Sequence, residues 1–236
     1  MSLAQALADL QELTAELRRE CPWDAEQTAR TIVPHTIEEA YEVADAAMAD
    51  DDAKLVDELG DLLYQTFFLS LLLAERGAGD LETVARNAHD KLVRRHPHVF
   101  GDARTPGSPG AVKHRWEELK TAQEGRSGVF HDVPETFPAL LYARKVQRRA
   151  AATSFAAPDV DVRLARLHEQ LGELREKLRE AGTPPPETEP DAGVMEELGD
   201  MLFDVVAVAS ELNVDSELAL RGASRRFMER VERDSP

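Results

Sequence analysis

The sequence has only one cysteine and few positively charged residues, and each shortage excludes a class of protein. The single cysteine, Cys21, cannot form a disulfide within the chain, which excludes a disulfide-stabilised secreted fold. Only 28 lysine and arginine residues accompany 45 aspartate and glutamate residues, so the formal net charge is −17 at pH 7. Proteins that bind nucleic-acid polymers carry an excess of basic side chains against the phosphates. We therefore expect no nucleic-acid polymer as a partner.

Long apolar runs are absent as well. The most apolar stretch, residues 62–74, is interrupted by Gln65, Thr66 and Ser70 and is shorter than the roughly 20 residues that cross a bilayer. The N-terminal residues lack the basic segment and the long apolar run of a signal peptide. We therefore expect a cytoplasmic protein without a membrane partner. Its 236 residues suffice for one large domain or two small ones.

Helical periodicity dominates the chain. Windows that alternate apolar and polar residues are few, whereas alanine, leucine, glutamate and arginine recur with apolar spacings of three and four. This pattern predicts an all-α fold. Ser2 is the expected N-cap of the first helix, Pro22 is expected to follow its end, and the second helix is expected to begin after Pro34. Helices are predicted over residues 3–19, 36–48, 53–76, 80–95, 114–124, 139–152, 161–181, 192–212 and 216–233.

One segment of the sequence occurs twice. LVDELGDLLY at 55–64 and VMEELGDMLF at 194–203 share an ELGD core at an offset of 139 residues. Each lies in an amphipathic predicted helix that follows another acidic helix, so we expect two antiparallel helical-hairpin repeats. The expected domains are an N-terminal unit (1–100), a linker with a short helix (101–137) and a C-terminal unit (138–236).

Four acidic residues of the first repeat are predicted to meet. Glu39 and Glu42 share one helix face, and so do Glu58 and Asp61, because each pair is three residues apart. In an antiparallel hairpin that turns near Asp50, Glu42 lies opposite Glu58. Glu39 then lies opposite Asp61. Two carboxylates about 5 Å apart at an effective dielectric constant near 20 repel by roughly 3 kcal/mol, so the cluster favours a bound cation. Oxygen ligands alone favour Mg²⁺ or Mn²⁺.

Each acid also has a purely structural interpretation. Thr36 and Glu39 have the spacing of a capping box, in which Glu39 binds the helix N-terminus. Glu58 and Asp61 are compatible with solvated residues beside Lys54. The sequence alone leaves both interpretations open.

Basic residues follow at the end of the fourth predicted helix. Lys91 lies three and four residues before Arg94 and Arg95, so the three side chains share one side of the helix. They fit either compensation of the helix dipole or a clamp for phosphate groups. Lys54, one turn before Glu58, is a second candidate for a phosphate contact.

The acidic motifs resemble a known signature. EEAYE at 38–42 followed by ELGD at 58–61 is similar to the EExxE…ExxD pattern of the all-α nucleoside triphosphate pyrophosphohydrolases, specifically the MazG family. Four further segments resemble MazG sequences in MazG order: CPWDAEQT at 21–28, KLVRRHPHVF at 91–100, WEELK at 116–120 and PALLYARKVQRRAA at 138–151. The resemblance implies tandem MazG-type helical units in an intertwined homodimer. It also implies Mg²⁺-dependent hydrolysis of (d)NTP to (d)NMP and pyrophosphate by water attack on the α-phosphorus, in nucleotide-pool housekeeping.

The same resemblance implies roles for individual residues. It implies Mg²⁺ as the cofactor, with Mn²⁺ as a substitute, and a nucleotide as the small-molecule partner. Trp23 and Asp24 match positions near the nucleoside. The implied metal ligands are Glu39, Glu42, Glu58 and Asp61. The implied catalytic residues are Glu38, which activates water, and the phosphate contacts Lys54, Lys91 and Arg95.

The second repeat departs from the pattern at one position. Glu197 and Asp200 preserve the ExxD pair, and Glu173 matches the third acid of EExxE. Gln170 stands where the second acid belongs, and a neutral amide brings less charge to hold a cation. We therefore expect the first unit to be catalytic and the second to have reduced or no activity.

Other functions remain as alternatives at this point. A non-catalytic acidic helical interaction protein is expected to bind no divalent cation specifically. A related all-α enzyme that hydrolyses dUTP or phosphoribosyl-ATP shares the fold but lacks the CPWD and RRHPHVF segments. A di-iron bundle is disfavoured, because none of the seven histidines has a glutamate three residues before it.

Overall fold

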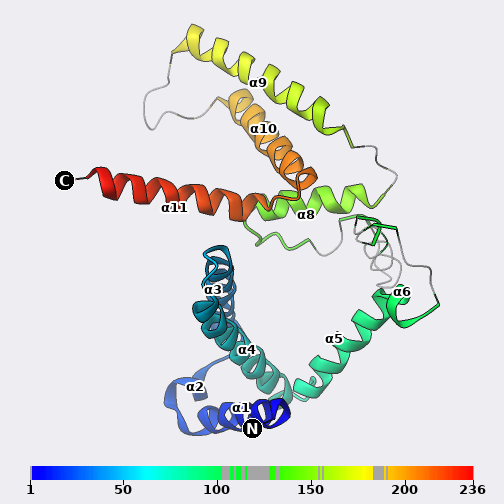
Figure 1. Cartoon of the computed structure of the whole chain (residues 1–236). Coiled ribbons are helices and arrows are strands. Elements are labelled where there is room, and N and C mark those ends of the chain that lie inside the picture. Colours follow the sequence, from blue (N-terminus) through cyan, green and yellow to red (C-terminus); the bar gives the residue numbers. More distant parts are fainter. Residues whose placement is uncertain are drawn as a thin grey trace. The chain divides into compact units, whose positions relative to one another are not determined.

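The structure is a computed structural model, in which every regular element of the described residues is a helix (Figure 1). It describes residues 2–102, 107–108, 110–112, 115, 128–130, 133–153, 155, 157–182, 189 and 191–235. The predicted all-α class is confirmed. The helices are α1 (Leu3–Glu20), α2 (Pro22–Glu26), α3 (Ala29–Met48), α4 (Asp52–Glu75), α5 (Leu81–Arg95), α6 (Pro97–Phe100), α8 (Ala139–Ala151), α9 (Val160–Ala181), α10 (Ala192–Glu211) and α11 (Ser216–Asp234).

Most predicted helix bounds agree with the structure to within one residue. The predicted cap Ser2 accepts a hydrogen bond from the backbone N–H of Gln5, which stabilises the start of α1. The turn between α3 and α4 lies at the expected place, where Asp50 adopts φ +53° and Asp51 accepts a hydrogen bond from the N–H of Lys54. The helix predicted at 114–124 lies outside the described residues except for residue 115.

The predicted start of the second helix is wrong. α3 begins at Ala29, seven residues earlier than Thr36, and Pro34 lies inside it. A proline inside a helix removes one hydrogen bond, which is why the sequence pattern favoured a start after Pro34. The structure compensates with a capping box between Thr28 and Thr31.

Packing also stabilises the early turns of α3. Ile32 is 1% exposed and forms a core cluster with Phe68 and Leu72 of α4. Thr36 is therefore an interior residue of α3, and its Oγ1 donates to the carbonyl of Ile32. The proposed capping box of Thr36 with Glu39 is wrong, so Glu39 does not bind a helix N-terminus.

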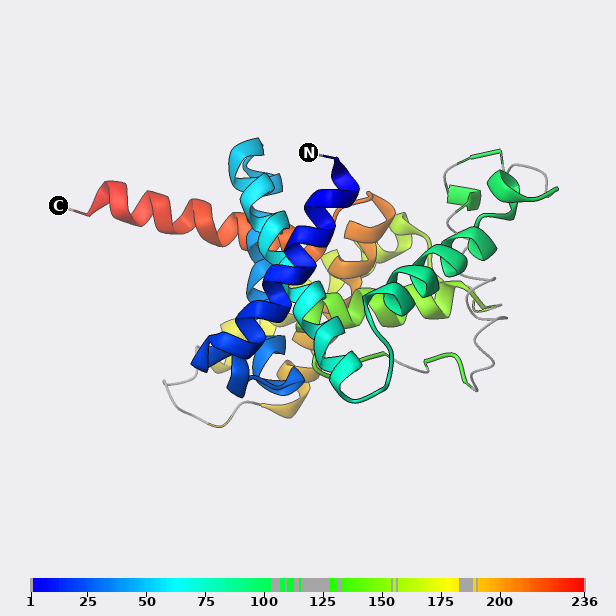
Figure 2. The same cartoon turned by 90° about the horizontal axis from the view of Figure 1, so that it is seen from below.

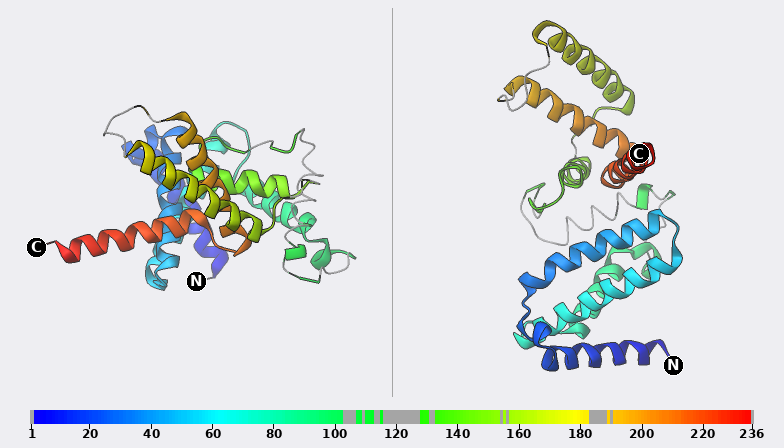
Figure 3. Two further views of the ribbon diagram at one scale, coloured as in Figure 1. Left: turned by 90° about the horizontal axis from the view of Figure 1, so that it is seen from above. Right: turned by 90° about the vertical axis from the view of Figure 1, so that its left-hand side faces the viewer.

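The chain divides into two compact units, residues 1–106 and 107–236. In the first unit, α3 and α4 form an antiparallel hairpin, which the right-hand view of Figure 3 shows clearly. α1 packs on α4 and on α2. Arg18 of α1 joins these elements, because its Nε donates to Glu75 Oε1 at 2.8 Å and its Nη1 donates to the carbonyls of Asp24 and Gln27.

In the second unit, α9 and α10 pack together as a hairpin. α8 packs on α10 and on α11. Across the described parts of both units, no helix is long and apolar enough to cross a membrane.

Candidate functional site

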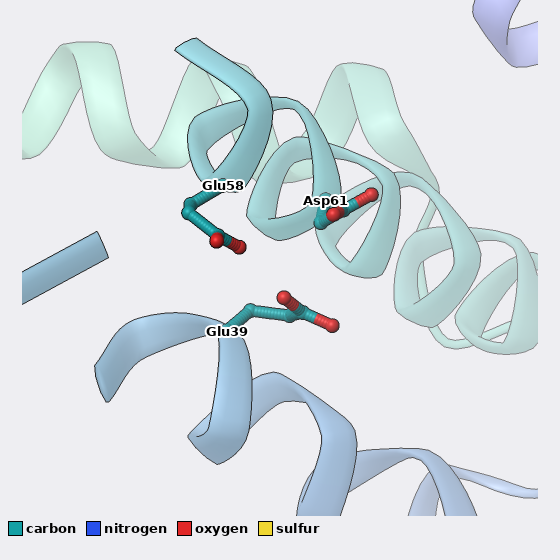
Figure 4. A group of neighbouring side chains, drawn as sticks. All are labelled: Glu39, Glu58 and Asp61. Carbon is teal, nitrogen blue, oxygen red and sulfur yellow. The ribbon is translucent and has the colours of Figure 1, made fainter. Parts of the chain in front are cut away.

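Three carboxylates meet between α3 and α4. Glu39 of α3 and Glu58 and Asp61 of α4 each place one oxygen within 4.8 Å of the other two (Figure 4). Glu58 is 7% exposed, Glu39 is partly buried, and Asp61 is exposed. The charge of the fourth predicted ligand, Glu42, acts on both Glu39 and Glu58, so its carboxylate lies beside these three. The hairpin thus brings together the four acids that were predicted to meet.

The same helix faces that form the core also carry these acids. Residues seven apart lie on nearly the same side of an α-helix, because two turns take about 7.2 residues. Members of this seam are Ile32 and Glu39 on α3 and Glu58, Asp61, Phe68 and Leu72 on α4. Burial of the apolar end therefore forces the carboxylates at the other end to face one another.

Crowding and burial raise the pKa of two acids. Burial raises the pKa of Glu39 above its ordinary value, and the charges of Asp61, Glu42, Glu58 and Glu38 raise it further. Burial also raises the pKa of Glu58, as does the charge of Glu42. A cluster of oxygen donors that disfavours its own negative charge fits a hard divalent cation, which would relieve the repulsion.

The raised pKa values predict a pH-dependent stability of the metal-free protein. Glu39 and Glu58 bind protons more tightly when folded, so stability falls as pH rises from the ordinary glutamate pKa through the raised values and stays lower above them. We expect Glu39→Gln to unfold at a higher urea concentration than the wild type at about pH 7 in EDTA. The difference in urea midpoint between Glu39→Gln and the wild type should shrink towards about pH 4. A variant less stable than the wild type at neutral pH would contradict this prediction.

The other predicted site residues lie at different distances from the acids. Lys54 is close, with its Nζ 3.7 Å from Glu58 Oε1. Glu38 is exposed at the edge of the cluster, where its charge acts on Glu39. Lys91 and Arg95 lie on α5, which packs on α4 and α6 and runs away from the α3–α4 hairpin (Figures 1 and 2). One copy of the chain therefore does not bring α5 against the carboxylates.

His35 is a neighbour of the site that the sequence analysis missed. Its Nδ1 lies 3.2 Å from Glu38 Oε2, and its ring meets the ring of Trp23 edge-on at 5.8 Å between centroids. The residue lies four positions before Glu39, one helical turn away. That spacing was a usable signal, but the predicted helix began at Thr36 and left His35 outside it.

Asp24 is buried in a contact between two helices and is not exposed to a nucleotide. It is 6% exposed, and its Oδ1 accepts a hydrogen bond from the hydroxyl of Tyr64 at 3.1 Å. Burial and this bond raise the pKa of Tyr64 to about 12. Asp24 thereby ties α2 to α4, whereas Trp23 beside it is 51% exposed.

The acids of the second ELGD segment have basic partners. Lys177 Nζ lies 2.5 Å from Glu197 Oε2, and Arg166 Nη2 lies 3.4 Å from Asp200 Oδ2. The hydrogen bond to Glu197 raises the pKa of Lys177. Within the described residues of this unit, no three metal-ligating side chains come together as Glu39, Glu58 and Asp61 do. Side chains of α9 neutralise the carboxylates here.

Comparisons with known proteins agree with the acidic motifs. Residues 27–100 match the MazG nucleotide pyrophosphohydrolase domain. The chain is 38% identical over 213 residues to the nucleoside triphosphate pyrophosphohydrolase of Escherichia coli strain K12, covering 89% of this chain and 78% of that protein. It is 39% identical over 215 residues to the nucleoside triphosphate pyrophosphohydrolase/pyrophosphatase MazG of Thermotoga maritima, covering 90% and 78%.

A crystal structure of a mazG-related protein from Thermotoga maritima is 27% identical, with a TM-score of 0.42 over 48% of this chain and 98% of that one. The sequence matches to the two enzymes extend over most of both proteins and show the family. The matched domain includes the four predicted metal ligands, Glu39, Glu42, Glu58 and Asp61. The chain belongs to the MazG family of nucleotide pyrophosphohydrolases.

Proposed function

We propose that this protein is a Mg²⁺-dependent nucleoside triphosphate pyrophosphohydrolase, which converts (d)NTP and water into (d)NMP and pyrophosphate in nucleotide-pool housekeeping. The observation that carries the proposal is the group of oxygens from Glu39, Glu58 and Asp61 within 4.8 Å of one another. This group lies inside the segment that matches the family domain. Two relatives that share most of the chain bear the name of this activity.

The residues of the seam fit distinct roles in this reaction. Glu39, Glu42, Glu58 and Asp61 would hold the cation, which supplies charge neutralisation for the triphosphate and lowers the pKa of bound water. The carboxylate of Glu38 is exposed beside them and would accept the proton of the attacking water. His35 Nδ1, 3.2 Å from Glu38 Oε2, would orient that carboxylate.

The leaving pyrophosphate needs positive charge. Lys54 lies 3.7 Å from Glu58, with a side chain that is 49% exposed, and is positioned to reach a phosphate oxygen beside the carboxylates. Lys91, which is exposed, would add charge from α5, whereas Arg95 is 7% exposed in its own chain. Because α5 runs away from the hairpin of its own chain, we propose that the corresponding helix of a second copy supplies it (Figure 2).

An exposed apolar stripe supports a homodimer. Leu164, Leu171 and Leu178 of α9 are spaced by seven residues and are 49%, 59% and 45% exposed. Leucines at this spacing form the seam of helix bundles, and an exposed seam favours association. We therefore propose that the protein is a homodimer. In each copy, the N-terminal unit is proposed to be the catalytic one.

The C-terminal unit is proposed to have little or no activity. Lys177 and Arg166 already pair with Glu197 and Asp200, so a cation would have to displace them. Gln170 adds no charge where Glu39 does in the first repeat.

A hydrolysis panel tests the proposed reaction. The purified protein is incubated with each canonical and several damaged (d)NTPs, with Mg²⁺ or with EDTA, and the products are separated by ion-exchange chromatography. We expect NMP and pyrophosphate only when Mg²⁺ is present. Release of orthophosphate would contradict attack at the α-phosphorus. Hydrolysis of dUTP alone would favour the dUTP pyrophosphatase, and absence of both hydrolysis and Mg²⁺ binding would favour the interaction protein.

A further inference from the structure

Gln65 is a buried polar residue between the carboxylate cluster and the apolar core. It lies seven residues after Glu58 and seven before Leu72 on α4, and positions seven apart differ by only about 20° around a helix. The stripe of α4 that carries Glu58 at one end and Leu72 at the other therefore carries Gln65 between them. Gln65 is 7% exposed.

The neighbouring helix α1 packs on a different side of α4. Phe67 and Ser70 line a small cavity together with Thr14 of α1. Successive residues are rotated by about 100° around a helix, so Gln65 and Phe67 lie on nearly opposite sides. Gln65 accordingly belongs to the seam with α3, in the layer next to the acids.

The carboxamide of Gln65 contains an unpaired hydrogen-bond acceptor. Its oxygen is buried and forms no hydrogen bond with the described residues. An unpaired buried polar group costs free energy, and such groups are usually satisfied by ordered water. Rotation of the carboxamide exchanges its NH₂ and carbonyl ends, so the group can either donate to or accept from such a water.

The matching position of the second unit has its partners within the chain. Asp204 follows the second ELGD segment at the same distance at which Gln65 follows the first. Asp204 is 4% exposed. Its Oδ1 accepts a hydrogen bond from Arg163 Nη1 at 2.6 Å, and its Oδ2 forms an ion pair with Arg166 Nε at 3.5 Å without a hydrogen bond. Among the described residues, no such cation or hydrogen-bond donor binds the side-chain oxygen of Gln65, which leaves this oxygen free to bind a water molecule.

Asp61 is the acid closest to Gln65 along α4, one turn earlier on the same stripe. It is exposed, and no ion pair or hydrogen bond from the described residues holds its side chain. We propose that Gln65 is a positioning residue of the metal site: its carboxamide binds a water molecule that also hydrogen-bonds Asp61 and so holds this carboxylate in its ligating orientation. This role rests on the proposed function, in which Asp61 is a metal ligand.

Replacement of Gln65 by methionine tests the inference, because Gln65→Met keeps the size of the side chain and removes both hydrogen-bonding groups. We expect the affinity for Mn²⁺ to fall roughly 10- to 100-fold, the loss typical when a residue that orients a metal ligand is removed. Isothermal titration calorimetry of the full-length protein measures it. The melting temperature without metal should stay equal or rise, because an unpaired polar group is removed.

Two further variants separate positioning from packing. Ser70→Ala removes a buried hydroxyl on another side of α4 and should leave Mn²⁺ affinity unchanged. Gln65→Asn keeps a carboxamide and should recover part of the affinity that Gln65→Met loses. Unchanged Mn²⁺ affinity in Gln65→Met would overturn the inference. Because binding is measured without nucleotide, failure of the wild type to hydrolyse any NTP would count against the proposed function alone.

Discussion

The double variant Glu39→Gln/Glu42→Gln is expected to lose pyrophosphate release by about 1,000-fold or more. Removal of a single preorganised group that stabilises transition-state charge costs about 100- to 1,000-fold, and this variant removes two charges from the proposed cation site. Its fold should be preserved, because replacement of Glu39 relieves a repulsion that raises its pKa. Steady-state release of pyrophosphate with Mg²⁺, together with the unfolding midpoint, measures both effects.

The second ELGD segment offers the matched control. Glu197→Gln/Asp200→Asn removes the same number of charges from acids that pair with Lys177 and Arg166. We expect nearly full activity, because these carboxylates are neutralised within the chain. Full activity in the Glu39/Glu42 variant, or a comparable loss in the control, would sink the assignment of catalysis to the first unit.

Mixing of variants extends this experiment to the proposed homodimer. Glu58→Gln removes a carboxylate from the cluster, and Lys91→Ala removes charge from α5. If α5 of one copy serves the carboxylates of the other, the mixed population should be more active than either variant alone. Activity no higher than the average of the two would mean that each copy builds its own site.

The variant Arg163→Met is expected to lower the free energy of unfolding by about 3–5 kcal/mol. The side chains of Arg163 and Asp204 are 11% and 5% exposed and meet at 2.6 Å. Removal of the arginine leaves a buried carboxylate whose remaining cation, Arg166, is half-exposed and 3.5 Å away. Urea unfolding followed by circular dichroism gives the free energy.

A second substitution distinguishes a lost charge partner from lost packing. Arg163→Met/Asp204→Leu removes both buried charges and should recover most of the stability, because apolar residues of similar volume replace a buried ion pair at little cost. The exposed pair of Arg179 with Glu176 is the control, and Arg179→Met should change the free energy by less than about 0.5 kcal/mol. A double variant as unstable as Arg163→Met would assign the effect to packing.

Much of the fold and most of the candidate site followed from local patterns. Helix bounds depend on periodicity and capping, which are set by residues close in sequence. Seven of the predicted helices both begin and end within one residue of those observed. The cluster followed because an antiparallel hairpin with a turn near Asp50 leaves little freedom in which residues face one another. The charge of Glu42, the fourth predicted member, acts on Glu58, the residue that the predicted hairpin placed opposite it.

The remaining features depend on contacts between segments that are distant in sequence. The early turns of α3 form across Pro34 because Ile32 is buried against Phe68, and that burial outweighs a local rule. For the same reason His35, one turn before Glu39, was left outside the predicted helix.

The sequence by itself determined the helical class, the acidic seam of the first repeat and the likeness to the MazG family, because periodicity and motif spacing are properties of the chain. Only the tertiary structure decided which carboxylates crowd together and which pair with cations from a neighbouring helix. In the first unit, Glu39, Glu58 and Asp61 crowd together, and the side-chain oxygen of Gln65 has no hydrogen-bond partner among the described residues. In the second, lysine and arginine side chains of α9 pair with the acids of α10. Charge compensation depends on distances across a helix interface, and composition and spacing do not specify those distances.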